Sequence, residues 1–419
     1  MKEYIKQIVY HPLFSGSMIM VIGSNAVSFI NYLYHFVMGR MLGPGDYGEL
    51  ASIISMIGLL GVLPSSITLV ITKQISSAKN DKEINSLLAW FKTKIFLASL
   101  IYTFFILILS PIMTSFLKIQ NTSYFLLIAF SFLFSLQSLL NRSILQGLLK
   151  FKEMVSSILA ESSAKLLISI ILVYLGLKVG GVILALAVSS LLGLYTTYYF
   201  LKLKKNLTTN ADRSVDIKSM LIFAVPVALQ SLASTSIYSS DVILVKHFFS
   251  TYEAGIYAAL STLGKIIFFG AGPIGAVMFP LISQRNARGE GYRKIFLYSF
   301  FATIMLSIGI MAVYWLYPQL AIRLLYGTAY LEAADLLIWF GIFISLFTLS
   351  SLLINYNLSL GKTSIVIIPL IAAFAQIIMI WFLHDSLLTV IFISIIINAL
   401  LLVSLLIYST YGKFTPFRR

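Results

Sequence analysis

Three charged residues lie within long apolar segments of the sequence, where each needs a partner or a role. Lys265 stands about 15 Å into the apolar segment 255–281 at 1.5 Å per helical residue, with no acidic residue three or four positions away. Glu161 and Lys165 share the segment 154–177 and lie four residues apart, so they can pair locally on one helix face. A charge at mid-bilayer costs roughly 2.5–3.5 kcal/mol. We therefore expect Lys265 to meet another helix, water or an anionic ligand.

Other polar residues near the segment ends have both a functional and a structural interpretation. Asn25, Asn31 and His35 share the first apolar segment, where they could face a cavity, although helix–helix hydrogen bonding explains the two asparagines equally well. His35 could titrate near neutral pH. A second group consists of charged residues that could switch ion pairs as an outer gate or could be solvated loop charges; its members are Arg40, Asp46, Glu49, Asp241, Lys246 and Glu253.

The residue patterns that support enzyme chemistry are missing from the sequence. It contains no cysteine, and its four histidines show no metal-ligand spacing. There is no Ser/His/Asp set, no phosphate-binding glycine loop and no pair of carboxylates. We expect no catalytic residues, no metal and no cofactor. Energy for any transport would come from an ion gradient, the membrane potential or the substrate's own gradient.

The composition indicates an all-α, polytopic integral membrane protein. Hydrophobic residues make up 59% of the 419-residue chain and charged residues 11%, against about half and a quarter in soluble domains. A membrane helix needs about 20 apolar residues. Twelve segments meet this need: 14–38, 50–72, 95–117, 123–140, 154–177, 179–201, 220–240, 255–281, 295–317, 336–358, 363–383 and 387–408.

The distribution of basic residues predicts the orientation of these segments. With both termini in the cytoplasm, 23 of the 30 Lys and Arg residues fall on the cytoplasmic side and five on the outer side. Such a bias is typical of membrane proteins. The basic residues lie in short loops, which argues for a membrane and against a nucleic-acid partner. No loop is long enough for a folded catalytic domain.

The charged segment 203–218 divides the chain into a predicted N-terminal six-helix bundle, 1–202, and a C-terminal one, 219–419. A shift of 207 residues aligns Gly48 with Gly255, in the second segment of each half. An even number of segments per half predicts parallel repeats. Pro273 follows Gly270 and Gly272, so the helix should be weak or bent there, as a transport hinge or for packing alone.

Several motifs resemble those of the bacterial polysaccharide (O-antigen or capsule) repeat-unit flippases, in the multidrug/oligosaccharidyl-lipid/polysaccharide exporter superfamily. They are Gly39–Gly48, Asn141–Gly147 with Lys150–Lys152, Ser240–Lys246, Tyr252–Ala259 ending at Phe279-Pro280, and Leu325–Gly327 followed by Tyr330 and Ala333. The order and spacing of these motifs extend from the first apolar segment to at least Lys362.

The resemblance implies two bundles in a V-shaped arrangement, similar to multidrug (MATE) exporters. It also implies transfer of undecaprenyl-diphosphate-linked oligosaccharide from the cytoplasmic to the outer leaflet of the bacterial plasma membrane. The product would feed O-antigen, capsule or another surface polysaccharide, with the polymerase and chain-length machinery as partners. On this hypothesis Lys265, Lys165, Arg40 and Arg142 attract the diphosphate, Glu161 is shared among the cations, and Asn25, Asn31 and Gln230 contact sugar hydroxyls.

Three other functions compete with this interpretation. An ion-coupled drug or metabolite antiporter of the same superfamily would need acids in its cavity, and Glu161 is the clearest candidate in the sequence. A membrane glycan polymerase or ligase would need a large outer loop. A passive scaffold would only be weakened by lysines and prolines within its apolar segments.

Overall fold

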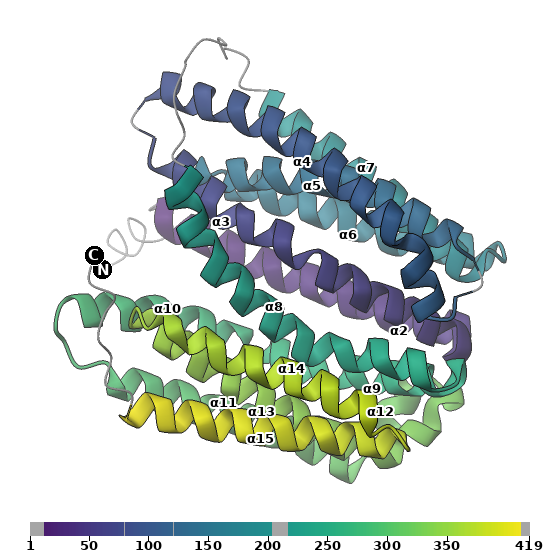
Figure 1. Cartoon of the computed structure of the whole chain (residues 1–419). Coiled ribbons are helices and arrows are strands. Elements are labelled where there is room, and N and C mark those ends of the chain that lie inside the picture. Colours follow the sequence, from purple (N-terminus) through teal and green to yellow (C-terminus); the bar gives the residue numbers. More distant parts are fainter. Residues whose placement is uncertain (1–11, 79, 120, 203–216, 412–419) are drawn as a thin grey trace, which may run out of the picture. The chain divides into compact units, whose positions relative to one another are not determined.

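The computed structural model describes residues 12–78, 80–119, 121–202 and 217–411, and these ranges contain helices and no strands (Figure 1). The first half contains α2 (Pro12–Leu60), α3 (Val62–Ser76), α4 (Asp81–Phe116), α5 (Ser123–Gly147), α6 (Phe151–Tyr174) and α7 (Lys178–Lys202). The second contains α8 (Ile217–Phe248), α9 (Thr251–Gly270), α10 (Gly272–Ala287), α11 (Arg293–Leu316), α12 (Pro318–Leu325), α13 (Ala334–Ser359), α14 (Ile367–Phe382) and α15 (Leu387–Tyr411), with 3₁₀ turns η1 (Thr328–Ala333) and η2 (Thr363–Val366). The all-α prediction is confirmed.

The helices divide the apolar segments differently from the sequence prediction. Among the described residues, nine helices are long and apolar enough to cross a membrane, or ten if α2 and α3, which meet at Gly61, form one span. All twelve predicted segments fall largely on helical residues, but the count of twelve stays a prediction. One reason is α2, which joins the first segment to the start of the second across Gly43, where φ is +74°. Glycine adopts this left-handed conformation without steric cost.

Backbone contacts group the chain into two compact units. Unit 1 consists of residues 1–42 and 63–225, and unit 2 of residues 43–62 and 226–419. The division into the halves 1–202 and 219–419 stays a prediction. The contacts group residues 43–60 of α2 with the second half of the chain. Most of the predicted linker, residues 203–216, lies outside the described residues.

Unit 1 is a bundle in which α7 packs against α5 and α6, and α4 packs against α5 (Figure 1). One of its cores contains Leu145 of α5 with Met154 and Val155 of α6. Large apolar residues remain exposed on α4, such as Ile101 and Phe104. Exposed apolar side chains along a helix of this length are expected where lipid is the solvent. The apolar sequence therefore serves both the core and the lipid-facing surface.

Unit 2 is organised around α13, which packs against α9, α11 and α15. Phe340, Phe343 and Phe347 of α13 are buried in this core. A hydrogen bond of 2.7 Å from the Tyr314 hydroxyl to the Leu263 carbonyl links α11 to α9. These contacts fix α9, the helix that carries Lys265.

Residues 43–60 of α2 pack closely on α9 within unit 2. A Cβ atom on Gly48 would lie 2.5 Å from the backbone nitrogen of Gly255, and one on Gly255 would overlap the carbonyl of Pro44. The Tyr47 hydroxyl lies 3.1 Å from Thr262 Oγ1 and 3.0 Å from the Tyr326 hydroxyl. Small residues allow membrane helices to approach this closely. The two glycines that align under the 207-residue shift are thus in direct contact.

Candidate functional site

A cavity with a largely polar lining lies in unit 2 where α8 faces the junction of α9 and α10. Its volume is about 460 Å³. Hydroxyl and amide groups from α8, α11 and α13 line it together with aromatic rings; the polar residues are Gln230, Ser231, Ser234, Thr235, Tyr238, Thr303, Thr348, Ser351 and Asn355, and the rings besides Tyr238 are Phe268 and Phe269. The sequence-predicted Gln230 therefore lines a cavity.

The junction of α9 and α10 forms one wall of this cavity. α9 ends at Gly270 and α10 begins at Gly272, with Pro273 in the first turn of α10. Ala271, Gly272 and Gly275 all line the cavity. The predicted interruption is present, although α9 and α10 together still form a single candidate span from Thr251 to Ala287.

Two polar atoms in the cavity lack a hydrogen-bond partner. Gln230 donates its amide to Ser234 Oγ at 3.0 Å, but Gln230 Oε1 is buried without a partner, and so is Ser351 Oγ. A buried polar group without a hydrogen bond costs about 1–3 kcal/mol. A ligand that carries hydroxyl groups would supply the missing hydrogen bonds.

Lys265 of α9 brings a positive charge next to this cavity. Its ammonium lies 5.2 Å from the ring centroid of Tyr238, which lines the cavity. The charge also interacts with that of Asp241 on α8. Of the three possibilities left open for Lys265, the structure shows an interaction with another helix, through Asp241, which the sequence analysis assigned to the outer gate.

Asp241 is a buried acid and not a solvated loop charge. Its side chain is fully buried, with Oδ1 accepting from the Val242 backbone nitrogen at 2.8 Å and Oδ2 accepting from the Tyr257 hydroxyl at 2.9 Å. The sequence interpretation that Glu161 is the clearest buried acid was incomplete. It failed because Asp241 lies near the end of the predicted segment 220–240, whereas α8 continues to Phe248.

The remaining residues of the predicted outer gate have local contacts in unit 2. Lys246 is buried, interacts with the charge of Glu49 and donates to Thr251 Oγ1 at 3.2 Å. Asp46 also interacts with Glu49. Glu253 forms a capping box with Ser250 at the start of α9. These contacts explain the charges structurally, and a gating role for them stays a prediction.

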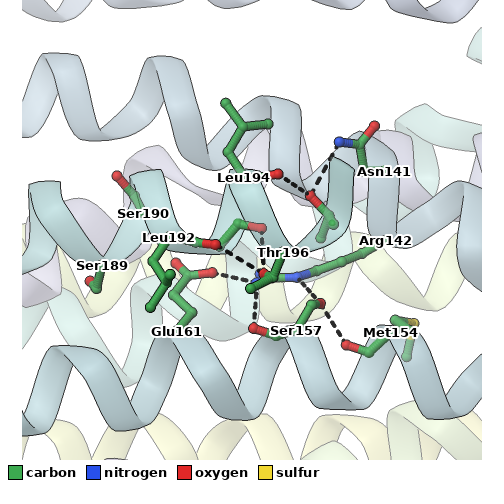
Figure 2. Close-up of polar contacts among 12 residues, drawn as sticks. Asn141, Arg142, Met154, Ser157, Glu161, Ser189, Ser190, Leu192, Leu194 and Thr196 are labelled. Carbon is green, nitrogen blue, oxygen red and sulfur yellow. Dashed lines mark hydrogen bonds and ion pairs between the residues drawn. The ribbon is translucent and has the colours of Figure 1, made fainter. Parts of the chain in front are cut away.

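Unit 1 has its own charged cluster, centred on Arg142 of α5 (Figure 2). Arg142 Nη2 forms an ion pair with Glu161 Oε2, and Arg142 Nε donates to Ser157 Oγ at 3.1 Å. A Cβ on Gly193 of α7 would overlap Glu161 Oε2. The lack of a side chain at Gly193 thus leaves room for the pair. Glu161 forms its ion pair with Arg142, and its interaction with Lys165 is one between charges on the same helix.

Lys165 lies one turn beyond Glu161 on α6 and faces α2. Its ammonium donates to Asn31 Oδ1 at 2.6 Å and lies 4.5 Å from the ring centroid of Tyr34. The charge of Glu161 also acts on Lys165. Arg142, Glu161, Lys165 and Asn31, all sequence-predicted, therefore form one cluster within unit 1.

Three predicted residues lie outside this cluster. Asn25 is exposed and donates to the carbonyl of Val21 on its own helix at 2.8 Å. The His35 ring makes an edge-on contact with Tyr34 at 5.4 Å between centroids. Arg40 is exposed near the end of the first predicted segment. Nothing in these contacts assigns the three residues a ligand.

The structure also reveals buried amides that the sequence analysis missed. Asn141 donates to Thr197 Oγ1 at 3.2 Å in unit 1 (Figure 2). In unit 2, Gln376 donates to the Ile237 carbonyl at 2.9 Å, and Asn398 donates to Gln376 Oε1 at 3.4 Å. The sequence signal that could have identified these residues was a lone amide side chain inside an apolar segment. Among the described residues, no group of histidine, aspartate and glutamate side chains could hold a metal ion.

The long apolar helices define a multi-pass membrane protein, and its fold is shared with solved membrane proteins. The structure is similar to an inward-facing multidrug resistance MATE family transporter of the MOP superfamily, with a TM-score of 0.74, 14% identity and coverage of 91% of this chain and 96% of the other. It is also similar to the lipid II flippase MurJ in an inward closed conformation, with a TM-score of 0.70, 15% identity and coverage of 93% and 87%.

Sequence comparison places the chain more narrowly. Residues 37–335 match the family described as polysaccharide biosynthesis protein, and the chain belongs to this family. An uncharacterised membrane protein of Methanocaldococcus jannaschii is 27% identical over 271 residues, which cover 60% of this chain and 63% of that relative. The match thus spans less than two thirds of the relative's length.

Proposed function

We propose that this protein is a flippase that moves undecaprenyl-diphosphate-linked oligosaccharide repeat units from the cytoplasmic to the outer leaflet of the plasma membrane for surface polysaccharide synthesis. The observation that carries the proposal is the cavity of unit 2, with its hydroxyls, its aromatic rings and the adjacent ammonium of Lys265. Membership of the polysaccharide biosynthesis family supports it.

Each part of the substrate has matching chemistry among the described residues. Sugar hydroxyls both donate and accept hydrogen bonds, which suits Gln230 Oε1 and Ser351 Oγ. A diphosphate is anionic, and lysine is a compact point charge suited to phosphate. Lys265 and, in unit 1, Lys165 supply such charges. Neither role requires a covalent step, so the proposed activity is transport and not enzyme catalysis.

The test is transfer of a labelled polyprenyl-diphosphate oligosaccharide between the leaflets of proteoliposomes. Lys265→Gln should slow transfer at least tenfold, because the ammonium that attracts the diphosphate is lost. Lys294→Gln is the matched control, since Lys294 is exposed at the start of α11. Normal transfer by a well-folded Lys265→Gln variant would contradict the assigned role of Lys265.

One observation favours a second function, an ion-coupled drug or metabolite antiporter. Asp241 is a fully buried acid near the cavity, and buried acids within a membrane commonly bind protons or cations. Against this, Asp241 already has a counter-charge in Lys265 and accepts a hydrogen bond from the Tyr257 hydroxyl. Uptake of a cationic dye under an ion gradient, with no oligosaccharide transfer for any sugar tested, would favour the antiporter.

A further inference from the structure

A second cavity lies in unit 1 among α4, α5 and α7, and one of its lining residues, Asn141, is next in sequence to Arg142. Its volume is about 740 Å³. Lys92, Thr93 and Phe96 of α4 form one wall, and Leu191, Leu194 and Tyr198 of α7 form the facing one. We call it the lateral groove.

The lateral groove has a positive charge and no lining residue of opposite charge. Lys92 is the one charged residue among those that line it, and Lys92 is exposed. The Lys92 ammonium lies 5.8 Å from the ring centroid of Tyr198, across the groove. A cation–π contact at this distance holds the ammonium at the mouth of the groove. The groove therefore favours an anion.

The lining of the groove combines polar and apolar residues, with Gln137 and Asn141 of α5 together with Phe96, Leu191 and Leu194. α4 forms a candidate span of 35 residues, about 52 Å at 1.5 Å per residue, whereas the hydrocarbon core of a bilayer is about 30 Å thick. The start of α4 must therefore extend into the headgroup region. Lys92 and Thr93 precede the apolar run that begins at Ile95, while Phe96 lies within it. On α7, Leu191 lies about 10 Å deeper than Tyr198.

We propose that the lateral groove binds a membrane phospholipid with an anionic headgroup. The phosphate pairs with the Lys92 ammonium beside the Thr93 hydroxyl, and one acyl chain runs along Phe96, Leu191 and Leu194. Charge complementarity selects an anionic lipid, and the apolar side chains that line the groove together with Lys92 match an amphiphile. The groove belongs to unit 1 alone and touches neither Lys265 nor the cavity of unit 2, so this inference does not depend on the proposed transport function.

Native mass spectrometry of the full chain in detergent can test this inference. Phosphatidylglycerol serves as the anionic probe and phosphatidylcholine as the zwitterionic one. We expect phosphatidylglycerol to bind more tightly, and Lys92→Gln to weaken it about fivefold, the effect of one basic residue at an anionic headgroup. Lys94→Gln is the matched control, because Lys94 is exposed two residues further along α4 but does not line the groove.

Three results would overturn the assignment. These are equal binding of the two phospholipids, equal loss in both lysine variants, or tighter binding of undecaprenyl phosphate than of phosphatidylglycerol at the same groove. The last result would identify the groove as a site for the isoprenoid carrier lipid.

Because Lys92→Gln changes an exposed residue, the denaturation temperature of this variant without added lipid should match that of the parent protein. Should it fall, Leu194→Trp, which fills the groove and keeps Lys92, should weaken phosphatidylglycerol binding in its place.

Discussion

At the scale of single residues, the two units satisfy their charges in different ways. In unit 1, Arg142 and Glu161 form a direct ion pair that a glycine on α7 leaves room for. In unit 2, Lys265 interacts with Asp241 while its ammonium remains beside the ring of Tyr238. The first arrangement stabilises the bundle, and the second leaves a cation next to a polar cavity. Lys265 is therefore the better candidate for binding an anionic substrate.

The Arg142–Glu161 pair should show coupling in a double-mutant cycle. Glu161→Ala leaves the mostly buried guanidinium without its counter-charge, and we expect a loss of about 3 kcal/mol in the free energy of unfolding. Adding Arg142→Ala removes the uncompensated charge, so the double variant should lose less than the sum of the two single losses. Denaturant unfolding in detergent measures the cycle. Additive losses would show that the two side chains do not interact.

Gln230→Leu should separate stability from transport. The substitution removes the partnerless Oε1 atom, so it should leave the free energy of unfolding unchanged or raise it by about 1 kcal/mol. Oligosaccharide transfer in proteoliposomes should fall at the same time, because sugar hydroxyls lose a partner. Leu297→Gln, on the exposed face of α11, controls for the general effect of exchanging these side chains. Faster or unchanged transfer would place Gln230 outside the substrate path.

At the scale of elements, residues 43–60 of α2 are joined to the rest of unit 2 by glycine contacts and a tyrosine cluster. Gly48 and Gly255 bring two backbones into contact, and Tyr47 packs with Tyr326 and Tyr330. Three of the sequence motifs that resemble the flippase family meet here. Their residues thus build an interhelical joint, and no ligand is needed to explain them.

Two glycines on α2 offer a matched test of this joint. Gly48→Ala places a methyl group against the backbone of α9, and we expect a loss of about 1–3 kcal/mol in the free energy of unfolding. A Cβ on Gly58 would meet no atom within 4 Å, so Gly58→Ala should be neutral or should stabilise the helix by up to about 1 kcal/mol. Thermal unfolding followed by tryptophan fluorescence compares the two variants. Similar unfolding temperatures would show that α2 and α9 do not pack as described.

At the scale of the whole molecule, the basic residues predict which side of the membrane each loop faces. The α10–α11 connection carries Arg288 and is followed at the start of α11 by Arg293 and Lys294, whereas the stretch between α11 and α13 carries only Arg323 as a basic residue. The bias of basic residues places the first connection in the cytoplasm and the second outside. The proposed direction of transport depends on this orientation.

The absence of cysteine from the sequence makes this orientation directly measurable. Glu290→Cys in the α10–α11 connection and Glu332→Cys in η1 are both at exposed positions. With intact cells, a membrane-impermeant maleimide should label Glu332→Cys and should label Glu290→Cys only after permeabilisation. The reverse pattern would show that the orientation is inverted. Labelling of both variants in intact cells would show that the two positions lie on the same side of the membrane, so that an even number of spans separates them.

The sequence by itself determined that this is a helical membrane protein, because apolar runs of membrane-spanning length dominate its composition. It also identified Lys265, Gln230 and the break before Pro273, since a charge, an amide or a proline stands out inside such a run. The four-residue spacing of Glu161 and Lys165 also showed that these two residues could pair on one helix. The choice of Arg142 as the ion-pair partner of Glu161 depended on how α5 packs against α6. Only the tertiary structure decided this, because contacts between distant segments leave no local pattern. The burial of Asp241, the contact of Gly48 with Gly255 and the lateral groove arise for the same reason.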